Sequence, residues 1–182
     1  MVSKISNVMY GEHAIILEAI QIASSLDKSW ETNPELYENN LKELLIFFKE
    51  YSDQYHHFKE EEILFPALLK MEEPSATAVI NELLEHHEDF RALVGKIKTD
   101  LAEKKYPEAQ QKIKEYSHDL LDHIAAENEE LFPMADTILS EGELEKLYYK
   151  CIDIDNELGI ERKEDLENFI KNFKFKLDET VK

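Results

Sequence analysis

The 182-residue chain contains little of what turns, disulfides and membrane spans require. It has one cysteine, four glycines and five prolines, so turn-forming residues are scarce and helix-forming residues dominate. The lone Cys151 excludes a disulfide within the chain and a metal site built from several thiolates, which is typical of a reducing compartment. No segment reaches the ~20 consecutive apolar residues that cross a bilayer. We therefore expect a cytoplasmic protein with no membrane contact.

Positive charge is also in short supply. The chain has 21 Lys and Arg residues against 40 Asp and Glu residues, which gives a formal net charge of −19. Phosphate backbones are bound by clustered lysine and arginine, so this balance argues against a nucleic-acid partner. Most of the acidic side chains are expected on solvated helix faces, which leaves a minority available to bind cations.

Four long segments carry apolar residues at intervals of three and four, which is the spacing of one buried helix face. Their connections are short, so successive helices should lie side by side and antiparallel. The sequence predicts an all-α fold, an up-down-up-down four-helix bundle over residues 1–140. Two shorter helical pieces over residues 141–182 are expected to form an extension packed on the bundle. The four long segments span about residues 6–27, 34–69, 75–106 and 107–139.

Two eleven-residue segments superimpose without a gap, and both read H-x-x-x-E-x-E-x-L-F-P. Residues four apart on a helix lie on the same side, so His56 can act with Glu60 and His123 with Glu127. Burying these four groups would cost several kcal/mol unless something paired them. A metal ion does so, and a mixed imidazole and carboxylate shell suits iron, with manganese and zinc as alternatives. The repeat therefore predicts a metal site.

The register of the first copy needs a choice, because His57 and Glu61 also fit H-x-x-x-E. Only His56 and Glu60 keep the distance to Leu-Phe-Pro that the second copy shows. We therefore favour His56 and Glu60 as ligands. Two further histidines, His13 and His87, lie in the first halves of the first and third helices, at the depth of the repeats.

The first repeat, H-H-x-K-E-E-x-x-L-F-P from His56, resembles the signature of the hemerythrin-like HHE cation-binding proteins. That family also has E-H on the first helix, matched by Glu12-His13, and E-H-x-x-x-R on the third. Aligning the arginine at Arg91 makes His87 the ligand on the third helix. His86 is the alternative, because it follows a glutamate as His13 does.

The resemblance implies a di-iron centre inside the bundle. Its cofactor would be two non-haem iron ions, oxo- or hydroxo-bridged, with Glu60 and Glu127 as bridging carboxylates. The leftover His57, His86 and His118 are expected outside the ligand set, and Tyr116 is expected to pack in the core. The implied ligands are His13, His56, Glu60, His87, His123 and Glu127.

One departure from the family pattern bears on function. Oxygen-carrying hemerythrins have a second histidine four residues after the first on the third helix, and that position here is Arg91. The resemblance therefore implies one protein ligand fewer and one more open position, which favours binding or sensing of oxygen, nitric oxide or peroxide. The alternatives are an oxidoreductase that reduces these molecules, an iron donor for iron–sulfur cluster repair, and a bundle without metal chemistry. No protein partner is indicated.

Overall fold

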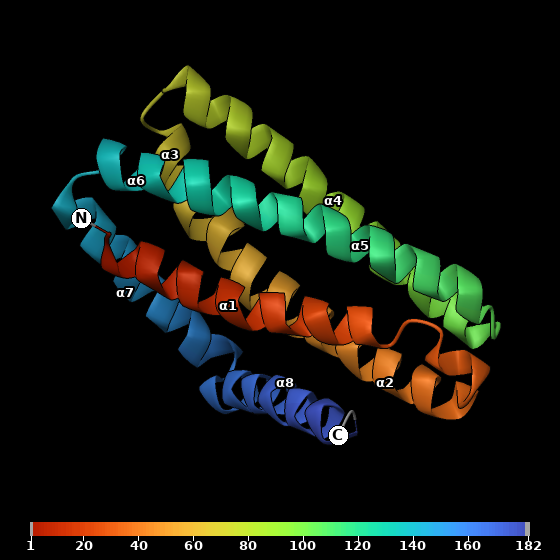
Figure 1. Cartoon of the computed structure of the whole chain (residues 1–182). Helices are drawn as coiled ribbons and strands as arrows, with labels where there is room; N and C mark the ends of the chain where they lie inside the picture. The colour runs from red at the N-terminus through yellow and green to blue at the C-terminus, as the bar shows by residue number, and fades with distance from the viewer. Residues whose placement is uncertain (1, 181–182) are drawn as a thin grey trace.

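Four long helical rods lie side by side in the computed structural model, with two further helices along one flank (Figure 1). The structure describes residues 2–180, and their side chains through residue 173. The all-α bundle predicted from the sequence is confirmed, and no strand occurs within residues 2–180. The first rod is α1 (Lys4–Ser25), and the second is α2 (Pro34–Phe47), η2 (Phe48–His57), η3 (Glu60–Leu64) and α3 (Phe65–Leu69). The third is α4 (Pro74–Ala102), and the fourth is α5 (Tyr106–Ala126), η4 (Glu127–Leu131) and α6 (Phe132–Ile138).

The flanking helices are α7 (Glu141–Leu158) and α8 (Ile160–Thr180), and a short 3₁₀ turn, η1 (Ser29–Glu31), joins the first two rods. The start of α7 has a capping box, in which Ser140 accepts the backbone N–H of Glu143 and the Glu143 carboxylate accepts the backbone N–H of Ser140. Apolar side chains of both helices pack into the bundle's core. The division of the chain into a bundle and an extension at residue 140 stays a prediction.

The fourth rod changes from α-helix to a wider π-helical turn at its repeat, and the second rod has π-helical turns both before its repeat, in η2, and within it, in η3. η3 begins at Glu60 and η4 at Glu127, and each ends at the leucine of Leu-Phe-Pro. The N–H of the phenylalanine that follows bonds the carbonyl five residues back, that of Glu60 or Glu127. A proline comes next, has no N–H and crowds the carbonyl four residues before it, so the turn widens. The repeat thus specifies a wide turn directly after each histidine–glutamate pair.

The buried apolar side chains form two clusters along the bundle with a polar layer between them. One cluster contains Ile16, Leu45 and Ile97, and the other contains Met9 and Phe132. Along each rod, the buried histidines and glutamates lie between the stretches that supply the two clusters. The core therefore holds these polar groups near the middle of the rods, and two apolar ends exclude water from them.

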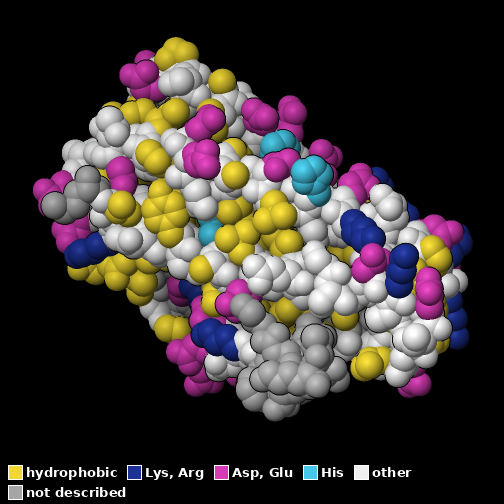
Figure 2. Space-filling model, in the orientation of Figure 1, with side chains coloured by type: hydrophobic (Ala, Val, Ile, Leu, Met, Phe, Trp, Pro, Cys, Tyr) yellow, Lys and Arg dark blue, Asp and Glu magenta, His cyan; other side chains and the backbone are white. Residues whose placement is uncertain are grey.

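The charged side chains on the surface agree with the acidic composition of the chain. Asp and Glu side chains are spread over the face in Figure 2, and several Lys and Arg side chains gather at the end where α4 passes into α5. Within the described residues, no helix is both long enough and apolar enough to cross a membrane.

Candidate metal centre

Seven histidine and glutamate side chains meet in the polar layer, and none is more than 2% exposed. α1 supplies one histidine and the second rod supplies two histidines and a glutamate. α4 supplies one histidine, and the fourth rod supplies a histidine and a glutamate. The seven are His13, His56, His57, Glu60, His87, His123 and Glu127.

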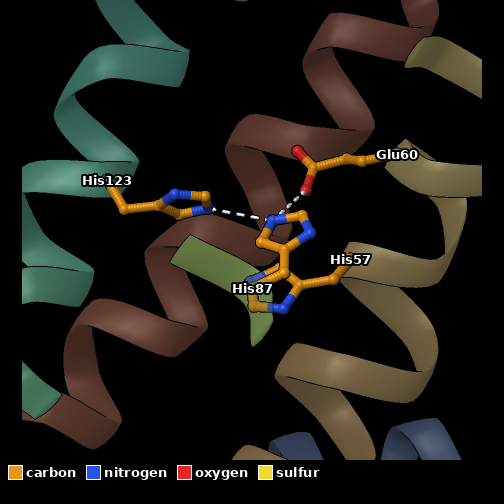
Figure 3. A group of neighbouring side chains, drawn as sticks. All are labelled: His57, Glu60, His87 and His123. Atoms are coloured by element: carbon orange, nitrogen blue, oxygen red, sulfur yellow. Dashed lines mark hydrogen bonds and ion pairs between the residues drawn. The ribbon is translucent and has the colours of Figure 1, made fainter. Parts of the chain in front are cut away.

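These side chains form two groups whose potential ligand atoms lie within 4.8 Å of one another. The first group is His13, His56, Glu60 and Glu127. The second group is His57, Glu60, His87 and His123, drawn in Figure 3. Glu60 belongs to both groups, so the two sites are adjacent and share a carboxylate.

Each glutamate turns one oxygen toward each group. Glu60 Oε1 lies 3.6 Å from His56 Nε2, and its Oε2 lies 3.6 Å from His87 Nε2. Glu127 Oε2 lies 3.2 Å from His13 Nε2, and its Oε1 lies 3.2 Å from His123 Nε2. Two carboxylates that face both sites in this way are suited to bridging a pair of cations.

Four of the histidines point Nε2 inward, while Nδ1 meets a polar group outside the layer. The inward Nε2 atoms approach in pairs, His13 with His56 at 2.7 Å and His87 with His123 at 3.2 Å. Metal-binding histidines have this arrangement, because a polar partner on one ring nitrogen orients the ring and fixes its tautomer. The Nδ1 partners are Asn128 for His13 at 2.8 Å, Glu12 for His56 at 3.0 Å, Glu61 for His87 at 2.7 Å and His86 for His123 at 3.4 Å.

The outer partners follow the internal repeat. Glu61 and Asn128 each come directly after a repeat glutamate, while Glu12 and His86 each come directly before the ligand histidine of α1 or α4. The first two rods and the last two rods therefore place the outer partners of their histidines at equivalent sequence positions. His57 has no counterpart in this pattern, because the second repeat has Ile124 at the equivalent position. One of the two sites thus gains a histidine that the other lacks.

The charge balance of the layer fits a cation. Both ring nitrogens of His57 and both oxygens of Glu60 are buried without a hydrogen bond, a rare and costly condition in a folded protein. Burial and the nearby Glu127 charge hold the pKa of Glu60 well above its usual range. Burial acts the same way on Glu127, but His123 and His13 outweigh it and hold the pKa of Glu127 well below its usual range. Bound metal ions would supply partners to the Glu60 oxygens and to one ring nitrogen of His57.

All six residues that the sequence singled out come together in this layer. The structure places His87 in the second group, while His86 is half-buried against the outer nitrogen of His123. His118 has a side chain 74% exposed and lies outside both groups.

We expected His57 to lie outside the ligand set, but the structure places it in the second group, among side chains that could hold a cation. That group contains three histidines although α4 has Arg91 where a second histidine would stand, and the number of ligands stays a prediction. The sequence did indicate that His57 could act with Glu60. His57 lies three residues before Glu60 and His56 lies four before it, and both spacings bring side chains together on a helix. The comparison of the two repeats hid this signal, since Ile124 holds the equivalent place.

A buried cluster of charges connects the metal centre to the extension, and no sequence pattern had indicated it. Lys59, which is completely buried, forms ion pairs with Glu12 of α1 and, at 2.5 Å, with Asp155 of α7. Lys163 of α8 reaches Glu12 at 2.5 Å and Asp155 at 2.7 Å. Burial acts to raise the pKa of Glu12, but His56 and the two lysines outweigh it and hold this pKa well below its usual range. The helices α7 and α8 thus help to fix the carboxylate that orients His56.

A helical bundle with buried histidines and glutamates grouped in this way has the architecture of a cation-binding bundle. The family model for the hemerythrin HHE cation binding domain matches residues 4–135. The chain therefore belongs to the hemerythrin HHE cation-binding domain family. Searches of curated proteins and of solved structures gave no match.

The stability of the metal-free protein is expected to fall as the pH drops below about 6.5, the unfolded-state pKa of histidine. Burial, aided by His13, lowers the pKa of His56 to about 4, and burial also lowers the pKa of His57 and His87. These histidines stay neutral when folded but take up protons when unfolded, so acidification favours unfolding. Each one that does so adds about 1.4 kcal/mol per pH unit to the slope.

Glu60 opposes this trend, because its raised pKa favours the folded protein at lower pH, but it is one group against three histidines. Urea unfolding of chelator-treated protein at several values between about pH 7.5 and pH 4.5 measures the net effect. A free energy of unfolding that stays constant across this range would contradict the expectation.

Proposed function

We propose that this protein holds two non-haem iron ions in the polar layer and uses them to bind or sense a small ligand. The observation that carries the proposal is the paired arrangement of the donors. Glu60 and Glu127 each turn one oxygen toward each of two groups of inward-facing histidine nitrogens. Imidazole and carboxylate donors in this number suit iron, and two glutamates suit a bridged pair.

His13 and His56 would hold one ion and His57, His87 and His123 the other. Glu60 belongs to both groups, and Glu127 belongs to the first and reaches the second through its oxygen beside His123, so both glutamates would donate to both ions. A bound iron pair supplies Lewis acidity and one-electron redox chemistry. Four protein donors would surround the first ion and five the second, so an external ligand has more room beside His13 and His56. The His13 ring is stacked on Phe132 with 5.4 Å between ring centroids, which gives this side an apolar wall suited to a small molecule such as oxygen, nitric oxide or peroxide.

Metal analysis tests the proposal directly. Protein purified in air, or reconstituted with ferrous iron and then exposed to air, should contain about two iron ions per chain and show a near-ultraviolet oxo-to-iron band. His118→Ala is the matched control, because His118 is exposed and should leave the iron content unchanged. Protein that stays metal-free after reconstitution would overturn the proposal.

The choice between a binding protein and an enzyme depends on turnover. Rapid mixing of the reduced, iron-loaded protein with oxygen, nitric oxide or hydrogen peroxide should give one binding event per iron pair for a sensor. Repeated consumption of the oxidant while a reductant is supplied would instead favour an oxidoreductase.

A further inference from the structure

A cavity of about 250 Å³ lies between η2, α4 and α5, beside the metal centre. This volume exceeds the ~150 Å³ that accommodates benzene in an engineered protein core. It is therefore larger than a diatomic gas or a peroxide needs. The cavity can hold a compact organic molecule, and the side chains around it indicate which kind.

The walls of the cavity are largely aromatic and apolar. Phe48 and Phe90 both pack against Tyr116, at ring-centroid distances of 4.8 and 5.5 Å, and all three line the cavity together with Val94. These four side chains are at least nine-tenths buried. The Tyr116 hydroxyl makes no hydrogen bond to any described residue. The interior thus offers a planar apolar body a close fit and one free polar atom.

The cavity ends on His57, which also belongs to the five-donor group of the metal centre. Its ring is 2% exposed and is stacked on His87 at 3.9 Å between centroids. Neither ring nitrogen of His57 has a hydrogen-bond partner. A molecule in the cavity would therefore lie next to the metal centre with the His57 ring between them. The residues that line it do not include His13 or His56.

The rim carries more positive than negative charge, although the chain as a whole has a net charge of −19. Lys49, Arg91 and Lys98 line the cavity, and Asp53 is the one acidic residue among the lining side chains. Arg91 is paired with Asp53, Glu61 and Glu88, each 2.7 Å away, and therefore adds no net positive charge to the rim. Lys49 and Lys98 are exposed and form no ion pair with any described residue. These two lysines are thus the rim cations that are free to meet an anionic group.

Gly95 keeps one wall of the cavity open. A Cβ atom added there would meet nothing within 4 Å. Glycine inside a helix such as α4 is destabilising relative to alanine, so helix stability does not explain it. Its effect here is to leave free space between the rim and the aromatic walls.

We propose that this cavity is a second ligand site, separate from the open metal position, that binds a compact organic anion. The apolar body of the ligand lies against Phe48, Phe90 and Tyr116, and its anionic group meets Lys49 and Lys98. The site is made by residues of η2, α4 and α5 alone, so it does not depend on the proposed metals being bound.

Fluorine NMR with 4-fluorobenzoate and its neutral isostere 4-fluorobenzamide tests this site in the metal-free full chain. The benzoate should bind about tenfold more tightly than the benzamide, which is the discrimination that two solvent-exposed ion pairs supply. The preference should shrink at high salt, because exposed charges are screened. In a Lys49→Gln/Lys98→Gln variant the two probes should bind equally.

Gly95→Leu should fill the cavity and abolish binding of both probes, whereas Gly95→Ala should leave the cavity open and binding unchanged. Both substitutions favour the helix, so melting temperatures at or above that of the unmodified protein would show that the fold is intact. Equal affinity for the two probes in the unmodified chain, or benzoate binding that survives Gly95→Leu, would overturn the proposal. If the protein fails to load iron but still binds the probes, the proposed function is overturned and the proposal of a second ligand site is not.

Discussion

Replacing Glu60 by glutamine is expected to abolish the binding of both metal ions while making the metal-free protein more stable. Glu60 is the residue shared by the two groups, and each of its oxygens faces a different histidine. A glutamine has one weaker acceptor in place of two anionic oxygens, so metal affinity should fall by more than the ~100-fold typical of losing an outer partner.

The gain in stability has a separate cause. Glu60 is completely buried beside Glu127, and neither of its oxygens has a hydrogen bond. The neutral amide of glutamine removes this cost and can donate to the Glu127 carboxylate, which should stabilise the metal-free protein by about 1–3 kcal/mol. In the presence of iron the order reverses, because only the unmodified protein gains the free energy of metal binding.

Metal analysis and urea unfolding with and without a chelator measure the two effects in Glu60→Gln. Glu62→Gln is the matched control, since Glu62 lies in the same π-helical turn but is exposed. It should change neither iron content nor stability. A Glu60→Gln protein that keeps two irons would contradict the bridging role, and one that is less stable without metal would contradict the charge argument.

Lys59→Met is expected to lower the free energy of unfolding by about 3–5 kcal/mol, the cost of leaving buried charges without a partner. Lys59 is completely buried and forms ion pairs with Glu12 and Asp155, which would be left with Lys163 alone. Methionine has a similar length, so little of the loss should come from packing. Lys150→Met, at an exposed position of α7, should cost far less.

A double variant separates charge from packing in this cluster. Lys59→Met combined with Asp155→Leu removes one charge of each sign and leaves Glu12 paired with Lys163 at 2.5 Å. Urea unfolding should then show at least half of the lost stability restored, because replacing a whole buried ion pair is often close to neutral. If the double variant lost the sum of the two single effects, the cluster would not act as a balanced unit.

Local patterns predicted most of the fold and singled out six of the seven side chains that gather in the polar layer. The apolar intervals located the rods, and Pro34 and Pro74 stand at the first turns of α2 and α4. The repeat located His56 and His123 together with their glutamates, because a spacing of four on a helix is a property of the chain alone. It also carried the prolines that widen the turns after Glu60 and Glu127.

The tertiary structure decided which residues far apart in the sequence come into contact. His57 joins the second group because η2 and α4 pack so that its ring stacks on His87, and the repeat gave no hint of this contact. Lys59 is buried and Lys163 largely buried because α7 and α8 pack against α1 and the second rod.

The sequence by itself determined the helices, the register of the repeat and most of the side chains in the candidate metal centre, since these depend on spacings of three to five residues. The tertiary structure alone decided that His57 joins this group, that an ion-pair cluster links the group to the extension, and that an aromatic cavity lies at His57. These depend on how rods pack across 30 to 150 residues of chain, where spacing in sequence carries no information about distance in space.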